Sequence, residues 1–223
     1  MELTLHGQRL CLLPQRAIFW PIQRTLLVAD LHLGKAATFA AAGVPVPAGS
    51  MSADLARLSG VIASTRAGRV IVLGDLLHAR HAHQPSVGDA LSQWRERHAD
   101  TEIVLIRGNH DRSAGDPPAA LRLNVVDGPW LCEPFVLVHE PIEEHERGYV
   151  LAGHVHPGVS LRSAWGGRAR AACFVIGRRR GVLPAFGGFT GMGRVPVREG
   201  DRIIAVGAVG EDLVELNAAS AGV

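Results

Sequence analysis

Five apolar runs in this 223-residue chain each end in a short segment that carries histidine, aspartate or asparagine. In chain order the segments are Asp30-Leu31-His32, Gly74-Asp75, Gly108-Asn109-His110-Asp111, Val138-His139-Glu140 and Gly153-His154-Val155-His156. Short apolar runs bounded by turn residues are typical of buried strands, whose carboxyl ends meet at one edge of a sheet. We therefore expect an α/β fold that gathers these polar side chains at such an edge.

The first half of the chain alternates between strand and helix patterns. Strands are expected at 3–5, 9–13, 17–20, 25–29, 70–73 and 103–106, and helices at 50–65 and 86–98, with a loop containing Pro45 and Pro47 before the first helix. Beyond about residue 122 short strands follow one another, at 123–126, 135–138, 149–151, 172–176, 203–207 and 213–216. This change predicts a second, mainly antiparallel sheet packed on the first, within one domain covering residues 1–223.

Composition restricts the class of protein further. Hydrophobic residues make up 47% of the chain, enough for a core without disulfides, and no apolar stretch approaches the ~20 residues that span a bilayer. The start of the chain lacks the pattern of a secretory signal. The three cysteines (Cys11, Cys132 and Cys173) are too widely spaced for a zinc finger or a disulfide framework. We expect a cytoplasmic protein without a membrane segment, with the cysteines as small core residues.

Taken singly, each polar residue in the five segments has an ordinary explanation. Asp30 suits a turn, Asn109 suits a left-handed position, and a histidine such as His139 on an apolar run is more often a hydrogen-bonded core residue than a ligand. Five such segments at converging strand ends are poorly explained by coincidence. In extended backbone, residues i and i+2 project to the same side, so Asp30 with His32 is expected to face one ion. The same spacing is expected to point both histidines of segment 153–156 into one cleft.

The donor types restrict the metal. Imidazole, carboxylate and amide groups without a thiolate suit Mn²⁺, Fe²⁺ or Zn²⁺ better than Ca²⁺ or an iron–sulfur cluster. Seven donors are enough for two adjacent divalent cations, and they are Asp30, His32, Asp75, Asn109, His139, His154 and His156. Paired cations clamp phosphoryl oxygens and acidify a shared water, which predicts hydrolysis of a phosphate ester.

The motifs D-x-H, G-D, G-N-H-D, H and G-H-x-H follow one another over about residues 24–156. In this series the chain resembles the calcineurin-like metallophosphoesterase superfamily. The resemblance implies a four-layer α/β/β/α sandwich with two mixed sheets and a dinuclear site at the carboxyl ends of the strands. It also implies hydrolysis of a phosphodiester by in-line attack of a metal-bound hydroxide.

The same resemblance assigns roles to the donors. One metal would be held by Asp30, His32, Asp75 and His156, and a second, bridged by Asp75, would be completed by Asn109, His139 and His154. His110 would contact the phosphate and protonate, or stabilise, the leaving oxygen, which suits an imidazole near neutral pH. Asp111 either orients His110 or caps the turn that follows.

A narrower resemblance covers nearly the whole chain. The segments VADLHLGKAATFAAAGVPVP, GDLLHAR, RGNHD, GHVHP and LPAFGGFTGM are similar to those of bacterial DNA ligase-associated metallophosphoesterases. That similarity implies a manganese-dependent single-strand DNA endonuclease in DNA repair, encoded beside a ligase, a helicase and an exonuclease. A homodimer is one option for its assembly.

Basic and aromatic residues near the five segments are candidates for contact with a nucleic acid. Lys35, Arg80 and Arg112 flank donor segments and could reach phosphates, with a plain surface charge as the alternative. The arginine run 178–180 and the glycine-rich loop 187–193 could border the cleft. The aromatic residues available to stack bases are Phe39, Trp165, Phe186 and Phe189, and the two phenylalanines flanked by glycines, Phe186 and Phe189, are the better candidates.

One position departs from the superfamily pattern. Many members have an acid three residues after the bridging aspartate, where this chain has His78. The cluster of His78, His81 and His83 is interpreted as a solvated loop, with a substrate contact or an adventitious metal site as alternatives.

Two other functions fit the same donor set. A small nucleotide or a nucleotide pyrophosphate would place its phosphate at the same metals, so the ligands do not distinguish it from DNA. A non-catalytic scaffold is the alternative of another class. Such scaffolds are expected to lose ligands or the acid histidine, whereas all seven ligands and His110 are present here.

Overall fold

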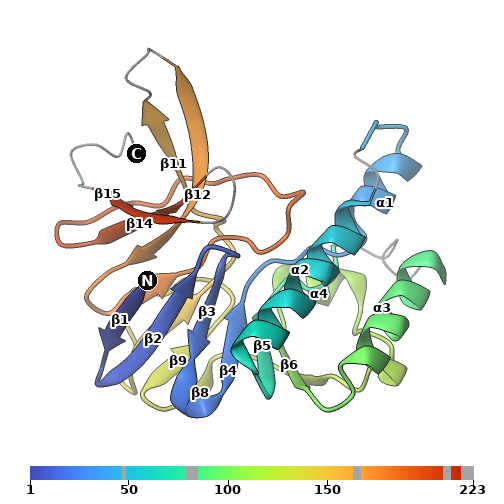
Figure 1. The fold of residues 1–223 in the computed structure, drawn as a ribbon, viewed down its shortest axis with the longest axis horizontal. Coiled ribbons are helices and arrows are strands. Elements are labelled where there is room, and N and C mark those ends of the chain that lie inside the picture. Colours follow the sequence, from blue (N-terminus) through green and yellow to red (C-terminus); the bar gives the residue numbers. More distant parts are fainter. Residues whose placement is uncertain (47–48, 79–84, 163–166, 208–211, 217–223) are drawn as a thin grey trace.

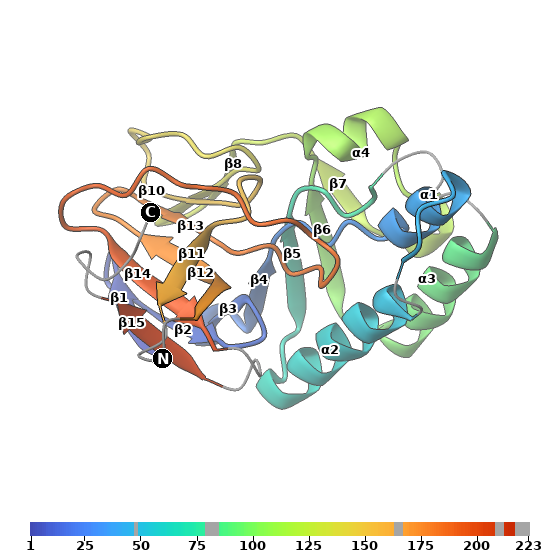
Figure 2. The ribbon, with the colours of Figure 1, turned by 90° about the horizontal axis from the view of Figure 1, so that it is seen from above.

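Two β-sheets lie face to face in the computed structural model, which describes residues 1–46, 49–78, 85–162, 167–207 and 212–216 (Figure 1). Helices cover the outer face of the first sheet, so the layers run helix, sheet, sheet when the molecule is seen from above (Figure 2). The prediction of an α/β sandwich built from two mixed sheets is confirmed, but of the four layers expected, the helical layer outside the second sheet is not seen among the described residues.

The first sheet contains seven strands in the order of the sequence. They are β1 (Glu2–Leu5), β2 (Gln8–Leu13), β3 (Ala17–Trp20), β4 (Thr25–Val28), β5 (Arg69–Leu73), β6 (Glu102–Ile106) and β7 (Asn124–Val126). Strands β1 to β4 form an antiparallel meander, whereas β4 to β7 are parallel. The carboxyl ends of β4, β5 and β6 therefore lie at one edge, and the first three donor segments follow them directly.

The second sheet contributes the other two donor segments. Its strands are β8 (Trp130–Cys132), β9 (Phe135–Leu137), β10 (Tyr149–Ala152), β11 (Gly158–Arg162), β12 (Arg168–Ile176), β13 (Arg180–Val182), β14 (Arg202–Val206) and β15 (Leu213–Leu216). The sheet is antiparallel except around β10, which runs parallel to β9 and to β13. His139 and His154 therefore leave parallel neighbouring strands in the same direction.

The helices connect the parallel strands of the first sheet. They are α1 (Lys35–Ala41), α2 (Ser50–Thr65), α3 (Pro85–Arg97) and α4 (Asn109–Ala114), with short 3-10 turns η1 (Pro21–Gln23) and η3 (Ala119–Leu121). Leu55, Leu58 and Ile62 recur along α2 at helical spacing and are all buried. None of the helices among the described residues is both long and apolar enough to cross a membrane.

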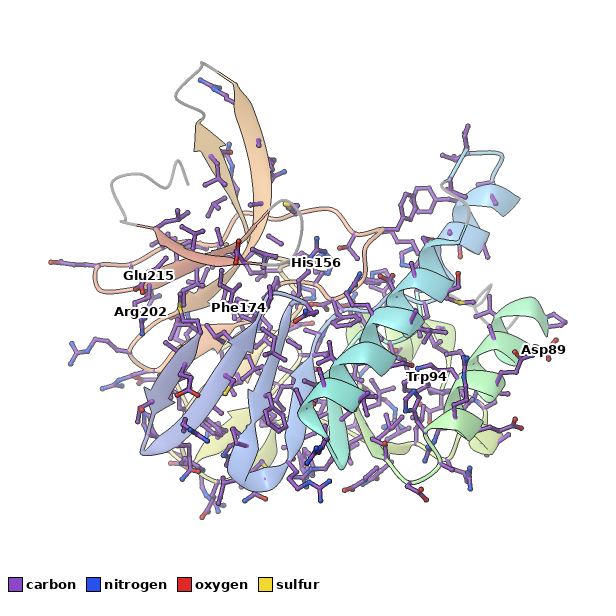
Figure 3. All side chains as sticks on the ribbon, in the orientation of Figure 1. Asp89, Trp94, His156, Phe174, Arg202 and Glu215 are labelled. Carbon is purple, nitrogen blue, oxygen red and sulfur yellow. The ribbon has the colours of Figure 1, made fainter. Side chains whose placement is uncertain are left out.

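Alternation along the strands divides the interior into two apolar layers. Leu26, Val28 and Val72 face α2 and α3, where Trp94 also lies (Figure 3). The intervening Leu27 and Ile71 face the second sheet, where they pack in the same cluster as Phe135 and Phe174. Each fully buried aliphatic or aromatic side chain contributes about 1.5–3 kcal/mol, so this inter-sheet layer fixes the two sheets against each other. The clusters on the outer face of the second sheet contain no helical residue among those described.

Some element predictions are corrected by the structure. The segment after Gly34, expected as a loop, begins with the helix α1, whose seven residues include four alanines. Strand β7 pairs with β6, so it belongs to the first sheet and not to the second. Strands β8, β11 and β13 were not expected. None of them contains an apolar run longer than three residues, so the sequence does not distinguish them from the surrounding turns.

Candidate metal centre

Two buried carboxylates form the floor of the site. Asp30 follows β4 and Asp75 follows β5, and their exposed fractions are 0% and 2%. Asp30 Oδ2 accepts the backbone N–H of His154 at 2.8 Å, and Asp75 Oδ1 accepts that of His110 at 2.9 Å. Within the described part of the chain, Asp30 Oδ1 has no hydrogen-bond partner. A buried carboxylate oxygen without a donor is costly, so this atom suits a bound cation.

One group of donors surrounds the unpaired oxygen of Asp30. His32 Nε2 and His156 Nε2 lie 3.2 Å apart, and His156 Nε2 is 3.8 Å from Asp30 Oδ1. His32 Nε2 is also 3.7 Å from Asp75 Oδ2. Figure 3 shows His156 between the second sheet and the helices that cover the first sheet. Asp30, His32 and His156 can hold one metal ion together.

A second group lies on the other side of Asp75. His139 Nε2 is 2.9 Å from Asn109 Oδ1, 3.0 Å from His154 Nδ1 and 3.5 Å from Asp75 Oδ1. Asp75, His139 and His154 can hold one metal ion, and the Asn109 oxygen faces the same nitrogen of His139. Asp75 thus lies between the two groups, with one oxygen near each. All seven predicted ligands are brought together.

Hydrogen bonds to carbonyl groups fix which ring nitrogen faces the site. His139 Nδ1 donates to the Leu73 carbonyl at 3.0 Å, and His156 Nδ1 donates to the Gly191 carbonyl at 3.2 Å. Because a carbonyl oxygen only accepts, each Nδ1 must carry the hydrogen, and the Nε2 lone pair points inward. This arrangement is typical of metal-binding histidines, whose second nitrogen is held by an acceptor outside the site.

Burial keeps the ring of His32 neutral. Desolvation, together with the nearby imidazoles of His156 and His110, lowers the pKa of His32 to about 2. Desolvation also raises the pKa of Asp75, against the opposing effects of His139 and the N–H of His110. A neutral imidazole offers its lone pair, and a carboxylate in a poorly solvated place gains from a bound cation. The donor set therefore fits divalent metal ions.

Most of the candidate ligands have left-handed backbone. The φ angles of Asp30, His32, Asp75, His154 and His156 all lie between 47° and 71°. The prediction that Asp30 and His32 converge because they lie in extended backbone was wrong in its reason, although the two side chains do meet. Tertiary bonds hold this strained conformation, among them His32 N–H to the Asp75 carbonyl at 2.8 Å and Asp30 N–H to the Gly74 carbonyl at 3.1 Å. Such strain outside glycine is concentrated at functional sites.

Two glycines let the donor loops approach one another. Gly74 has a φ of +80°, and a Cβ there would lie 2.1 Å from His139 Nδ1. A Cβ on Gly108 would lie 2.1 Å from Asp75 Oδ1. Both positions require glycine because ligand side chains fill the space that any other residue would need.

Asp111 supports the loops that carry the donors. Its Oδ2 atom accepts the N–H groups of Asp75 and Gly108 at 2.7 and 2.9 Å, and its Oδ1 atom accepts that of Leu77 at 3.0 Å. The bond to Gly108 is that of a residue in the first turn of α4 reaching back to the start of the helix. None of these three bonds involves the ring of His110. Asp111 therefore contacts the backbone around the site and not a reacting group.

His110 and His78 form a stacked pair at the rim. Their ring centroids are 4.8 Å apart with an interplanar angle of 20°, and His110 Nδ1 donates to the His78 carbonyl at 2.7 Å. His78 Nδ1 also lies 3.3 Å from His32 Nδ1. The interpretation of His78 as part of a solvated loop was wrong, because its half-buried ring touches both a candidate ligand and the candidate acid. His81 and His83 lie outside the described residues. The signal in the sequence was the position of His78, three residues after Asp75.

The basic residues occupy different places. Lys35 begins α1, next to the first donor segment, and its side chain is near the rings of His32 and His78. Arg112 on α4 is exposed and forms a 3.5 Å ion pair with Asp127, while Arg80 lies outside the described residues. The run 178–180 does not border the donors. Arg180 lies opposite Val150 in the pairing of β13 with β10, near the start of β10, whereas His154 follows the end of that strand. The side chain of Arg180 forms an ion pair with Glu143.

The aromatic residues considered for base stacking differ in their burial. Phe186 is fully buried in the helix-side core, so the expectation that it lines the cleft was wrong. Phe39 and Phe189 are half-buried, and their ring centroids are 5.7 Å apart. Trp165 lies outside the described residues.

Comparisons with known proteins agree with this geometry. The family described as calcineurin-like phosphoesterase matches residues 23–166, a range that includes all five donor segments. The nuclease MPE of Pseudomonas putida, known from a crystal structure, is 44% identical, with 97% of this chain and 99% of that chain covered and a TM-score of 0.82. The phosphoesterase Yfce of E. coli is 13% identical, with 86% and 97% covered and a TM-score of 0.40, too distant a likeness to bear on the site. The chain matches no curated protein.

Proposed function

The chain belongs to the calcineurin-like phosphoesterase family, and on this premise we propose that it is a dinuclear metal-dependent endonuclease acting on single-stranded DNA. The observation that carries the proposal is the likeness to the nuclease MPE of Pseudomonas putida, to which this chain is 44% identical over 97% of its length. The two donor groups on either side of Asp75 supply the metal sites that such an activity needs.

The proposed ligand assignment follows the two groups. Asp30, His32 and His156 would hold one cation, Asn109, His139 and His154 would hold the other, and Asp75 would contact both. Divalent cations bound there would polarise the phosphodiester and lower the pKa of a water beside it. Manganese suits this mixture of oxygen and imidazole donors, and we propose it as the working metal, ahead of Fe²⁺ or Zn²⁺.

His110 is proposed as the group that holds the proton for the leaving oxygen. Its Nδ1–H is fixed by the His78 carbonyl, so its Nε2 is free to face a substrate. Asp111 then acts as a positioning residue, since it fixes the loops that carry Asp75 and Asn109.

The side chains at the rim of the site are open to solvent. The carboxylates are buried, but Asn109 is exposed, and His110, His154 and His156 are partly exposed. Lys35 and Arg112 add positive charge next to two donor segments, which favours a polyanion over a neutral ligand. We further propose a role in DNA repair beside a ligase, a helicase and an exonuclease, in the cytoplasm. These proposals, together with homodimer formation, rest on the sequence resemblance alone.

Cleavage of a circular single-stranded DNA by the purified protein tests the proposal, because only an endonuclease can open a circle. Mn²⁺, Fe²⁺, Zn²⁺ and EDTA are compared in parallel, with Asp75→Asn as the inactive control. Conversion of the circle to linear fragments, fastest in Mn²⁺ and absent in EDTA, is expected.

Small phosphodiesters supply the contrasting result. Turnover of cyclic nucleotides or dinucleoside pyrophosphates without any opening of the circle would overturn the proposed substrate. Failure to hydrolyse any phosphodiester in any metal would favour the scaffold alternative.

A further inference from the structure

A row of four aromatic rings leads away from the candidate acid. The ring of His110 stacks on His78 at 4.8 Å, Phe39 follows at 6.3 Å from His78, and Phe189 follows at 5.7 Å from Phe39. We call these four residues the aromatic row. Phe39 belongs to α1 and Phe189 to the segment after β13, which crosses from the second sheet toward α1 (Figure 1).

The two phenylalanines are not part of the protein core. Among the described residues, neither ring belongs to any of the apolar clusters, and α1 packs on the helix-side core through Ala37 instead. Both rings are partly exposed to solvent. Core packing therefore does not account for two large apolar side chains placed together at the rim of a polar site.

Both phenylalanines are anchored to the same donor segment. The Lys35 N–H at the start of α1 donates to the His32 carbonyl at 3.1 Å. The segment carrying Phe189 is fixed by Gly187 N–H to the Asp30 carbonyl at 3.1 Å, and by Gly188 N–H to the Asp54 carboxylate at 2.9 and 3.0 Å. The rings are thus held at a defined position relative to the metal ligands, as a preorganised binding subsite requires.

A cation accompanies the rings. Lys35 Nζ lies 6.0 Å from the centroid of the Phe39 ring, and both residues belong to α1. Adjacent aromatic rings and a basic side chain are the combination that proteins use to bind single-stranded nucleic acid, since every base has a face that stacks and every linkage carries a charge. A neutral or purely apolar ligand would not use the ammonium group.

We propose that Phe39 and Phe189 form a subsite that stacks the base of a nucleotide next to the scissile phosphate, while Lys35 binds a flanking phosphate. This inference rests on the proposed function and adds to it the element that selects a nucleic acid over a simple phosphodiester. The base contact is made through the ring faces, so it discriminates bases from abasic sugars more strongly than one base from another.

Oligonucleotides with a single abasic residue test the subsite. For the wild-type protein, kcat/KM at one of the phosphates beside the abasic residue is expected to fall about 5- to 150-fold, the effect of losing one base stack. Phe39→Leu and Phe189→Leu are expected to lower cleavage of the unmodified oligonucleotide by a similar factor, with no further loss at the abasic residue. Phe19→Leu, at a half-buried phenylalanine on β3, is the matched control and should leave the abasic effect unchanged.

The outcomes separate the inference from the function on which it rests. Equal slowing of unmodified and abasic substrates in the Phe39 and Phe189 variants, or no abasic effect in the wild type, would overturn the subsite. A wild-type protein that cuts no oligonucleotide would overturn the proposed function. In that case the subsite is judged by inhibition of bis(p-nitrophenyl) phosphate hydrolysis. Thymidine 5′-monophosphate should inhibit more strongly than ribose 5-phosphate, and Phe39→Leu should remove the difference. Equal inhibition by both compounds in the wild type would count against the subsite.

Discussion

The Oδ2 atom of Asp111 accepts a hydrogen bond of 2.7 Å from the backbone N–H of Asp75, although 36 positions separate the two residues. The same carboxylate accepts the N–H groups of Gly108 and Leu77. One buried side chain therefore joins the loop after β5 to the loop after β6, and so sets the position of Asp75 relative to Asn109. This bond network places the candidate bridging ligand before any metal binds.

Removal of the Asp111 carboxylate should weaken both folding and metal binding. Asp111→Ala would leave three buried N–H groups without an acceptor, which is expected to lower the free energy of unfolding by about 3 kcal/mol or more. Asp111→Asn keeps one accepting oxygen, so its free energy of unfolding should lie between those of the wild type and Asp111→Ala. Urea unfolding without metal and calorimetric Mn²⁺ binding measure the two effects. Asp127→Asn, at an exposed ion pair, is the control and should change stability by about 1 kcal/mol or less. Wild-type metal affinity in Asp111→Asn and Asp111→Ala alike would show that the network does not position Asp75.

His110→Ala should separate chemistry from metal binding. The metal content of the two donor groups around Asp75 should stay at the wild-type level, since His110 belongs only to a separate cluster with His32 and His78, whereas kcat should fall by about 10²- to 10⁴-fold. The loss should be smaller for bis(p-nitrophenyl) phosphate than for an oligonucleotide, because p-nitrophenolate leaves without a proton. Elemental analysis and kinetics on both substrates measure this, with His6→Asn on an exposed turn as the control. A variant that loses its metal would identify His110 as a ligand instead.

Lys35 should contribute one phosphate contact. For a single strand, the slope of log K against log salt concentration changes by about 0.7 for each phosphate neutralised. Lys35→Met and Arg112→Gln, measured by fluorescence anisotropy with a labelled oligonucleotide in Ca²⁺, are each expected to reduce the slope by about that amount. Arg97→Gln, at an exposed position in the last turn of α3, should leave it unchanged. An unchanged slope in Lys35→Met would place this lysine off the path of the strand.

Asp54 predicts a pH dependence of stability. Burial raises the pKa of Asp54 even though Arg57 and the Gly188 N–H act in the opposite direction. When the pKa of a carboxyl is higher in the folded than in the unfolded state, the folded protein loses stability as pH rises from the unfolded-state pKa to the folded-state pKa. The lower limit of this range is the ordinary value of about 3.9. The stability of the wild type relative to Asp54→Asn should therefore decrease from about pH 4 upward and then level off. Urea unfolding in EDTA across this range measures it. A relative stability that increases with pH would mean that the pairing with Arg57 dominates.

Much of the fold follows from local patterns in the sequence. The helix 50–65 was predicted with both of its ends, because Leu55, Leu58 and Ile62 recur at one helical spacing in a segment bounded by turns. The strands before Asp30, Asp75 and Asn109 were predicted to within a residue or two, because each is a short apolar run that ends at turn residues. Helix α1 was missed although its alanines favour a helix, since the small residues and the later Pro45 and Pro47 suggested a loop. The partner of β7 could not be inferred, because three residues carry no information about which sheet they join.

The site was predictable as a set of donors but not as a geometry. The types and order of the five segments indicated a dinuclear centre, and the structure brings all seven donors together. The left-handed backbone at Asp30, His32 and Asp75 could not be predicted, because it is imposed by bonds between loops that are distant in the sequence. The contact of His78 with His32 and the place of Phe39 beside it have the same origin.

Anomalous diffraction at the manganese edge, from crystals grown with Mn²⁺, tests most directly whether these loops hold two cations that share Asp75. Two peaks are expected, one among Asp30, His32 and His156 and the other among Asn109, His139 and His154, both within bonding distance of the Asp75 carboxylate. Asp75→Ala should lose both peaks and nearly all hydrolysis of phosphodiesters. A single peak, or two peaks that do not touch Asp75, would contradict the shared carboxylate.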